Sequence, residues 1–127
     1  MKQTVFIPGP LPGLNEIIAA SKRRLKKNGR RRVFEFSQMK ADWDMRVSIA
    51  CKMAGMVPMK RADIGIIWVE KDRRRDPDNI MAGKKFILDG LVKAGILKND
   101  GWRQVGSFTE IVEVGELPGA HVTLIGE

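Results

Sequence analysis

The chain has 127 residues, enough for one domain with its own apolar core. The apolar fraction is 43%, but no apolar run approaches the roughly 18 residues of a membrane helix, and the start, MKQTVFIPGP, does not resemble a signal peptide. The single cysteine, Cys51, excludes an intrachain disulfide and a cysteine-rich zinc site. We therefore expect a soluble, cytoplasmic protein in which Cys51 is a small buried hydrophobe.

The net charge of +8 is concentrated in one segment. Residues 22–32 (KRRLKKNGRRR) hold eight of the 23 lysines and arginines and no acid, which leaves 15 basic against 15 acidic residues elsewhere. Because like charges repel one another, we interpret the segment as a mobile loop or arm. Its expected partner is nucleic acid, bound through counterion release, and the alternative is a solvated tail. The basic residues concerned are Lys22, Arg23, Arg24, Lys26, Lys27, Arg30, Arg31 and Arg32.

The first half of the chain predicts a strand and two helices. Residues 3–8 (QTVFIP) read as a strand closed by a turn-rich stretch, and residues 14–21 as a short helix. Ser37 is the expected N-cap of a longer helix that ends near Gly55. Its apolar residues recur at helical spacing, which predicts core packing. They are Met39, Trp43, Val47, Ala50, Cys51 and Ala54.

The second half predicts three strands and one helix. Residues 62–70 (ADIGIIWVE) are apolar on both strand faces, which indicates a central strand covered on both sides. A helix is expected over 78–94, ended by a C′ glycine. Residues 104–114 and 120–126 read as a hairpin joined by GELPG. This order predicts a single α/β (α+β) domain, with two main helices packed on a mixed sheet.

The segment RRRDPDNI, residues 73–80, lies between the central strand and the second helix, at an edge where α/β sheets favour ligand sites. Pro77 keeps Asp76 extended, so Asp76 and Asp78 point to the same side. Two close carboxylates without a histidine or cysteine suit Mg²⁺. In the alternative, Asp76 caps the helix, Asp78 interacts with the helix dipole, and the preceding arginines pair with both acids.

One lysine shares a face with these acids if the helix is continuous. At 100° per residue from Asp78, Lys85 and Asp89 fall on the same face, whereas Lys84 leans toward the core. The spacing of Lys85 and Asp89 is also that of a simple surface ion pair. The pattern favours Lys85 over Lys84 as the lysine near the carboxylates.

A further acid, Asp100, follows the helix in LKNDGW. The helix rises about 24 Å from Asp78 to Ala94, whereas six extended residues return only about 20 Å. Within one chain Asp100 therefore reaches Asp76 and Asp78 only if the helix starts late, after Gly83. A two-fold dimer with antiparallel helices would instead bring Asp100 of one copy to the acids of the other.

The stretch DPDNIMAGKKFILDGLVKAGILKND, residues 76–100, resembles the RusA family of Holliday junction resolvases of bacteria and their prophages. The similarity comprises a DxDN motif, a lysine, an LDAL-like segment, a glycine and a terminal acidic position, in that order. It implies a homodimeric α/β endonuclease that uses Mg²⁺, with Mn²⁺ as a substitute, to cut branched DNA in recombination and repair. Asp76, Asp78 and Asp100 would be the metal-binding catalytic acids, assisted by a lysine.

Two departures from the family pattern bear on these roles. About three extra residues precede the LDGL segment, so the lysine matches either Lys84 or Lys85; counting back four from Asp89 selects Lys85. Asn99 replaces the first member of the usual acidic pair, which should reshape metal binding if Asp100 is the member that matters.

The resemblance also gives the neighbouring arginines a role. Arg73, Arg74 and Arg75 would neutralise backbone phosphates, a role that can coexist with ion pairing. The main alternative to a nuclease is a DNA-junction-binding protein that has lost cleavage, although a pure DNA binder gains little from three aspartates, which repel phosphate. A small RNA-associated protein is a further alternative. Of the three tryptophans, only Trp102 falls outside a core pattern and is available to contact a base.

Overall fold

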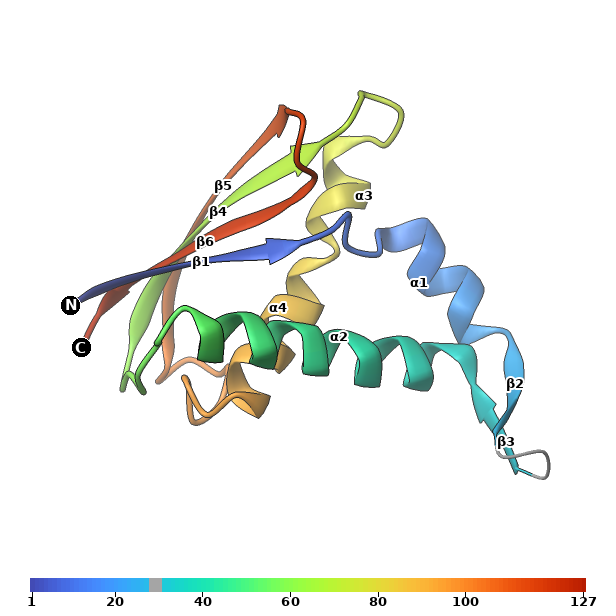
Figure 1. The fold of residues 1–127 in the computed structure, drawn as a ribbon, viewed down its shortest axis with the longest axis horizontal. Helices are drawn as coiled ribbons and strands as arrows, with labels where there is room; N and C mark the ends of the chain where they lie inside the picture. The colour runs from blue at the N-terminus through green and yellow to red at the C-terminus, as the bar shows by residue number, and fades with distance from the viewer. Residues whose placement is uncertain (28–30) are drawn as a thin grey trace.

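The computed structural model describes the backbone of residues 1–27 and 31–127, and the side chains of residues 1–24 and 34–127. A four-stranded mixed sheet with helices packed on it forms the body of the molecule (Figure 1). The α+β fold predicted from the sequence is therefore confirmed. In spatial order the strands are β1 (Lys2–Pro8), β6 (Gly119–Gly126), β4 (Ala62–Glu70) and β5 (Val105–Val114).

The pairing of the last two strands differs from the prediction. β6 runs antiparallel between β1 and β4, and β5 pairs in parallel with the other side of β4. β5 and β6 are therefore not a hairpin, although a short turn joins them. The turn chemistry is the same in both arrangements, and it does not specify that β4 lies between the strands that the turn connects.

β4 is central in the sheet, as predicted, but it is not covered on both faces. Ile64, Ile66 and Trp68 are buried on the face toward the helices, whereas Asp63 and Ile67 are exposed on the other. The continuous apolar run reflects an open sheet face that retains some apolar residues, which is common on protein surfaces.

The N-terminal helices largely follow the sequence pattern. α1 spans Leu14–Ser21 as predicted, and α2 spans Glu35–Met53. α2 begins two residues before Ser37, at Glu35, with Phe34 as its N-cap, so the predicted Ser37 cap is wrong. Of its predicted core stripe, Trp43, Val47 and Cys51 are buried, and Met39 and Ala50 are partly buried against the core. Ala54 is exposed at the end of the helix, so its predicted place in the core is wrong. Within the described residues, no helix is long and apolar enough to cross a membrane.

The helix expected over 78–94 is divided in two. α3 spans Pro77–Met81 and α4 spans Lys84–Lys93. The interruption includes Gly83, where an added Cβ would lie 3.1 Å from the Pro12 carbonyl oxygen and 3.2 Å from Leu11 Cβ. Glycine permits this close approach and is a poor helix former, which explains the division at this point. The predicted C′ glycine, Gly95, has a positive φ of 77°.

The core lies between the sheet and the pair α2 and α4. Trp68 of β4 and Phe86, Ile87 and Leu91 of α4 are all at most 2% exposed. α4 approaches α2 at Gly90, where an added Cβ would overlap the Val47 side chain. This close packing fixes the position of α4, and with it the loop that follows, relative to the sheet.

The basic segment forms a small element of its own at one end of the molecule. β2 (Arg24–Lys27) pairs antiparallel with β3 (Arg31–Phe34), and Figure 1 shows this pair away from the main sheet, between α1 and α2. The Glu35 N–H donates to the Arg23 carbonyl at 2.9 Å where the pair meets α2. The predicted arm thus contains two strands rather than irregular loop alone, because backbone pairing does not require the charged side chains to be buried. Arg30 lies outside the described residues, as do the side chains of Lys26, Lys27, Arg31 and Arg32.

Candidate active site

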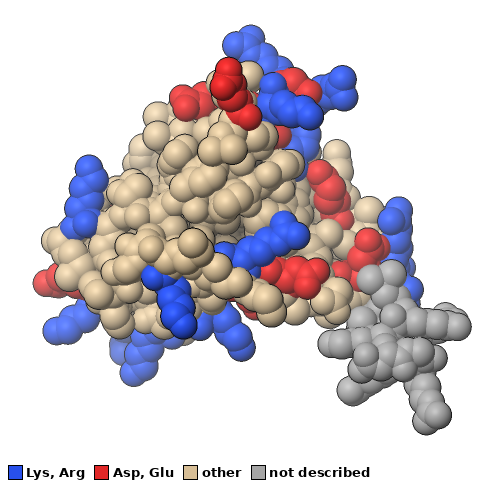
Figure 2. All heavy atoms as spheres, viewed as in Figure 1, with Lys and Arg blue, Asp and Glu red and all other residues tan. Residues whose placement is uncertain are grey.

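The turn that follows β4 carries the charged residues that the sequence singled out. Lys71, Asp72, Arg73 and Arg74 are exposed, and Asp76 directly precedes α3. Figure 2 shows basic and acidic side chains gathered at this tip of the molecule. The predicted location, at the carboxyl end of the central strand, is confirmed.

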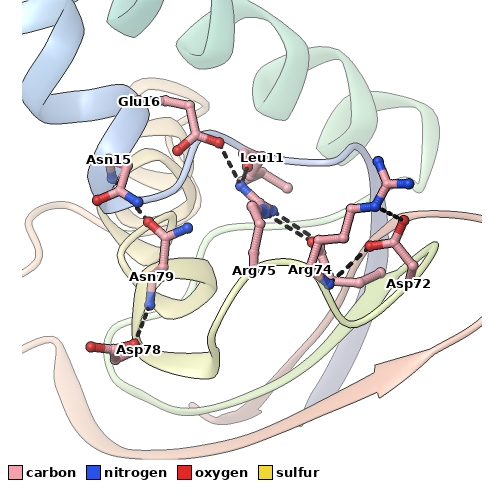
Figure 3. Close-up of polar contacts among 9 residues, drawn as sticks. Leu11, Asn15, Glu16, Asp72, Arg74, Arg75, Asp78 and Asn79 are labelled. Atoms are coloured by element: carbon pink, nitrogen blue, oxygen red, sulfur yellow. Dashed lines mark hydrogen bonds and ion pairs between the residues drawn. The ribbon is translucent and has the colours of Figure 1, made fainter.

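Arg75 anchors this turn to the body of the protein. Its Nε and Nη2 donate to the two carboxylate oxygens of Glu70, both at 2.9 Å, and its Nη1 donates to the Leu11 carbonyl at 2.9 Å and to Glu16 at 3.1 Å (Figure 3). Hydrogen bonding to Glu70 is the main cause that raises the pKa of Arg75 above its ordinary value. Each of the three guanidinium nitrogens therefore has a protein acceptor. Of the two roles considered for the arginines, ion pairing within the protein describes Arg75.

The other two arginines remain at the surface. Arg74 pairs with Asp72, with Nε 3.5 Å from the carboxylate, and the Arg74 side chain is 89% exposed. Arg73 is exposed and has no ion pair among the described residues. These two side chains are thus available to an external anion, whereas Arg75 has its donors occupied within the fold.

Asp76 and Asp78 are both exposed at the start of α3. Asp76 is the N-cap residue of α3 and has the extended backbone that Pro77 predicts, with φ −70° and ψ 151°, but its side chain makes no capping hydrogen bond. The capping alternative is therefore met in position only. An Asp78 oxygen accepts the N–H of Asn79 at 2.9 Å, and the carboxylate lies on the side of Asn79 away from Asn15 (Figure 3). Within the part of the chain whose side chains are described, neither acid forms an ion pair.

Asn79 holds α3 against the first helix, a role that the sequence reasoning missed. The residue is 9% exposed, and its Oδ1 accepts the backbone N–H of Asn15 at 2.9 Å in the first turn of α1. An added Cβ at Gly13 would lie 2.8 Å from the Asn79 amide oxygen and 2.9 Å from Arg75 Nη1. The sequence signal for this contact is Asn79 itself, a polar residue that directly precedes the apolar and buried Ile80.

Asp100 lies beyond α4 and borders a different hollow from Asp76. The hollow beside Asp76 is lined in part by Glu70, Arg73 and Glu113. The one beside Asp100 is lined by residues of α2, α4 and the following loop, namely Lys40, Asp44, Asp89, Val92, Lys93 and Asn99. The late helix start at Lys84 that would have allowed a contact is present, yet no group of three potential metal-ligating residues occurs among the described residues. One copy of the chain does not gather the three predicted acids.

The two lysines at the start of α4 have different surroundings. Lys84 forms an ion pair with Glu110 of β5 and lies over the Phe108 ring at 4.7 Å. Lys85 is 54% exposed at its side chain and pairs with Asp89 at 3.4 Å, which is the surface pair that its spacing allows. Because the helix is interrupted, the single stripe that joined Asp78 to Lys85 does not form. Lys85 is the more accessible of the two lysines.

A second polar cluster, also missed from the sequence, lies between α2 and α4. Lys40 is 3.0 Å from Asp44 and 3.7 Å from Asp89. Its hydrogen bond to Asp44 is the main cause that raises the Lys40 pKa above its ordinary value. The lysine lies between two partly buried carboxylates and reduces their mutual repulsion, which gives the cluster a structural role.

The turn offers two exposed carboxylates to a cation. Mg²⁺ is usually bound through one or two protein carboxylates and keeps several waters, so Asp76 and Asp78 fit this ion. No protein-family model matches the chain, and a search of the curated proteins finds no match.

Proposed function

We propose that the protein is a Mg²⁺-dependent endodeoxyribonuclease that resolves four-way junctions and other branched DNA in recombination and repair. The proposal rests above all on Asp76 and Asp78, two exposed carboxylates without an ion pair among the described residues. They lie at the junction of the turn and α3, where Arg75 and Asn79 fix the backbone. A fixed pair of unneutralised acids next to exposed arginines is suited to a cation that bridges protein and phosphate.

The anchoring of this turn supports a site rather than an incidental surface loop. Arg75 connects the end of β4 to the segment before α1, and Asn79 connects α3 to α1 itself. Four segments of the chain thereby converge next to two acids that form no ion pair among the described residues. Catalytic groups need such supports, because small errors in position cost rate.

Each residue of the proposed site would have its own role in phosphodiester hydrolysis. Asp76 and Asp78 would hold the metal ion, which when bound polarises the phosphate and lowers the pKa of a coordinated water. Arg73 and Arg74 would hold neighbouring phosphates and orient the strand to be cut. Lys85 would neutralise charge that develops on the phosphate.

The basic hairpin formed by β2 and β3 would extend the contact along a DNA arm. Lys22, Arg23 and Arg24 are exposed at its base. Contacts of this kind are made to phosphates and set orientation rather than sequence. Affinity should consequently fall steeply as salt concentration rises.

A homodimer forms part of the proposal. Asp100 of one copy would join Asp76 and Asp78 of the other, because a single chain places Asp100 beside a different hollow. A closed two-fold dimer would carry two such sites, one for each strand to be cut at a junction. A cytoplasmic location at the nucleoid goes with this function.

Two observations favour a second candidate, a DNA-junction-binding protein without cleavage. The three acids are not gathered within the described chain, and Asn99 stands where an acid is expected. Incubation with a labelled four-way junction and a matched linear duplex, in Mg²⁺ and in EDTA, separates the candidates. A nuclease cuts the junction in Mg²⁺ and not in EDTA. Binding without cleavage in either Mg²⁺ or Mn²⁺ would support the second candidate.

A further inference from the structure

Trp102 is the most exposed large apolar side chain of those described. Its side chain and backbone together are 96% exposed, whereas Trp43 and Trp68 are 6% and 2% exposed in the core. Single exposed apolar residues are common, but an indole with almost no intramolecular packing adds nothing to the stability of the fold. Exposed tryptophans on ordered backbone are typical of contact surfaces, where they contribute strongly to binding.

The turn that carries Trp102 is held firmly to the sheet. Arg61 Nη1 donates to the Trp102 carbonyl at 2.9 Å and to the Arg103 carbonyl at 3.4 Å. The Gln104 and Val105 N–H groups donate to the Gly101 carbonyl at 3.1 and 3.0 Å. The backbone below the indole is thus fixed before any ligand binds, which lowers the ordering cost of binding.

The side chains around Trp102 define the ligand chemistry. Lys98 and Arg103 are exposed on either side of it in the sequence, and Asn99 lines the same hollow as Trp102. An aromatic face flanked by cations is the arrangement that binds an unstacked nucleobase, since the ring stacks on the base and the cations contact the adjacent phosphates. Bases in an intact duplex are already stacked, so this ligand exists only where the DNA is branched or single-stranded.

We propose that Trp102 stacks on an unpaired base of the branched DNA, with Lys98 and Arg103 on the flanking phosphates. The inference rests on the proposed function in that the substrate is DNA. It gives Trp102 a role separate from that of the acids, namely recognition of the branch point. A contact to an unpaired base distinguishes a branch point from a duplex, whereas phosphate contacts do not. Asp100 lies only two residues before Trp102, which would bring the indole next to the proposed shared site.

Tryptophan fluorescence can test this contact directly. Because Trp43 and Trp68 are buried, Trp102 should account for most of the quenching by acrylamide. In EDTA, where no cleavage occurs, a four-way junction with an unpaired nucleotide at its centre and a short oligo(dT) should each protect Trp102 from acrylamide. A fully paired linear duplex should not. Trp102→Phe should abolish the quenchable emission and leave the unfolding midpoint unchanged.

Affinity measurements in the same buffer provide a second test of stacking by Trp102. Trp102→Ala should weaken binding of the unpaired-nucleotide junction by roughly tenfold or more, and Trp102→Phe should retain most of the affinity. Neither variant should change affinity for the linear duplex. Equal weakening for junction and duplex, or unchanged acrylamide quenching on junction binding, would overturn the stacking role.

The same acrylamide quenching tests whether a second copy of the chain covers Trp102 instead of DNA. If raising the protein concentration without DNA shields Trp102 from acrylamide, the indole lies between two copies of the chain and the proposal is wrong. None of these measurements depends on catalysis. A wild-type protein that binds but does not cut would therefore end the nuclease proposal while leaving the stacking result to stand on its own.

Discussion

Arg75 and Glu70 form a two-point ion pair at the base of the turn that carries Asp76, with both nitrogen–oxygen distances at 2.9 Å. The two side chains are 19% and 11% exposed, so solvent screens the pair only weakly. Arg75 also contacts Leu11 and Glu16, and it thereby connects β4 with the segment around the start of α1. The acids of the proposed site depend on this pair for their position.

Arg75→Ala should lower the free energy of unfolding by about 3 kcal/mol, because it leaves the Glu70 carboxylate largely buried without its partner. Arg75→Lys keeps the charge but loses the planar fork, so its loss should be intermediate. Urea denaturation measures both. Arg73→Ala is the matched control on the same turn and should change stability by less than about 0.5 kcal/mol. An Arg75→Ala protein as stable as the control would remove the anchoring role.

Gly13→Ala should disturb the site although it alters no acid. The new Cβ would lie within 2.9 Å of Arg75 Nη1 and 2.8 Å of both oxygens of Asn79, so the contact between α1 and α3 must open. We expect a loss of about 1–3 kcal/mol in stability, as for other overpacked positions, together with reduced junction cleavage.

Gly65→Ala is the appropriate comparison for that substitution. An added Cβ there has its nearest neighbours at 4.0 Å, which is ordinary contact distance. The variant should keep wild-type stability within about 0.5 kcal/mol. If thermal melts show the two alanine variants to be equally stable, the tight packing around Gly13 does not support the turn.

Cys51 gives a pH-dependent test of the core. Burial raises the pKa of its thiol from 9.0 to about 11. The unfolded thiol therefore loses its proton first, and the stability that this group contributes is present below pH 9 and is lost as the pH rises toward 11. Urea titrations of wild type and Cys51→Ala should show the steeper fall over this interval in wild type. At pH 8 the folded thiol is almost entirely protonated, so iodoacetamide should label it slowly; rapid labelling of folded protein would contradict its burial.

Shared sites predict complementation between inactive variants. Asp76→Asn and Asp100→Asn should each be inactive alone, and their mixture after subunit exchange should recover up to about a quarter of wild-type nicking, because half the dimers then carry one intact site of two. Asp76→Asn mixed with Asp78→Asn is the control, since both acids come from the same copy and no intact site can form. Absence of rescue in the first mixture, with exchange verified, would show that the sites are not shared.

The elements with long apolar patterns were predictable from the sequence, and their arrangement in the sheet was not. The four strands of the sheet, the core stripe of α2 and the span of α1 all follow from local periodicity. The placement of β6 between β1 and β4 depends on contacts between distant segments, which a turn motif does not report. The division of α3 from α4 arises from the close packing of Gly83 on Leu11 and Pro12, which no local pattern shows.

The same distinction applies to the site. The position of Asp76 and Asp78 after the central strand followed from the order of the elements, and the extended backbone of Asp76 followed from Pro77. The helical stripe through Lys85 was wrong because it assumed one continuous helix, whereas α3 ends at Met81 and α4 begins at Lys84. Asp76 does occupy the N-cap position of α3, but its side chain makes no capping hydrogen bond. The contact of Asn79 with Asn15, 64 residues away in sequence, is a tertiary contact that helix propensity cannot predict.

The central proposal is that Asp76 and Asp78 hold the metal ion that promotes DNA cleavage. The alternative is that they are ordinary exposed acids without a role in cleavage. Single-turnover cleavage of a four-way junction in Mg²⁺ by Asp78→Asn and by Asp72→Asn tests it most directly, because Asp72 is a nearby acid on the same turn that already pairs with Arg74. Asp78→Asn should bind the junction and cut it at least about a hundredfold more slowly, the usual cost of removing one electrostatic group from an active site. Asp72→Asn should cut within about twofold of the wild-type rate, as expected for an exposed pair. Cleavage by Asp78→Asn at the wild-type rate would contradict the account.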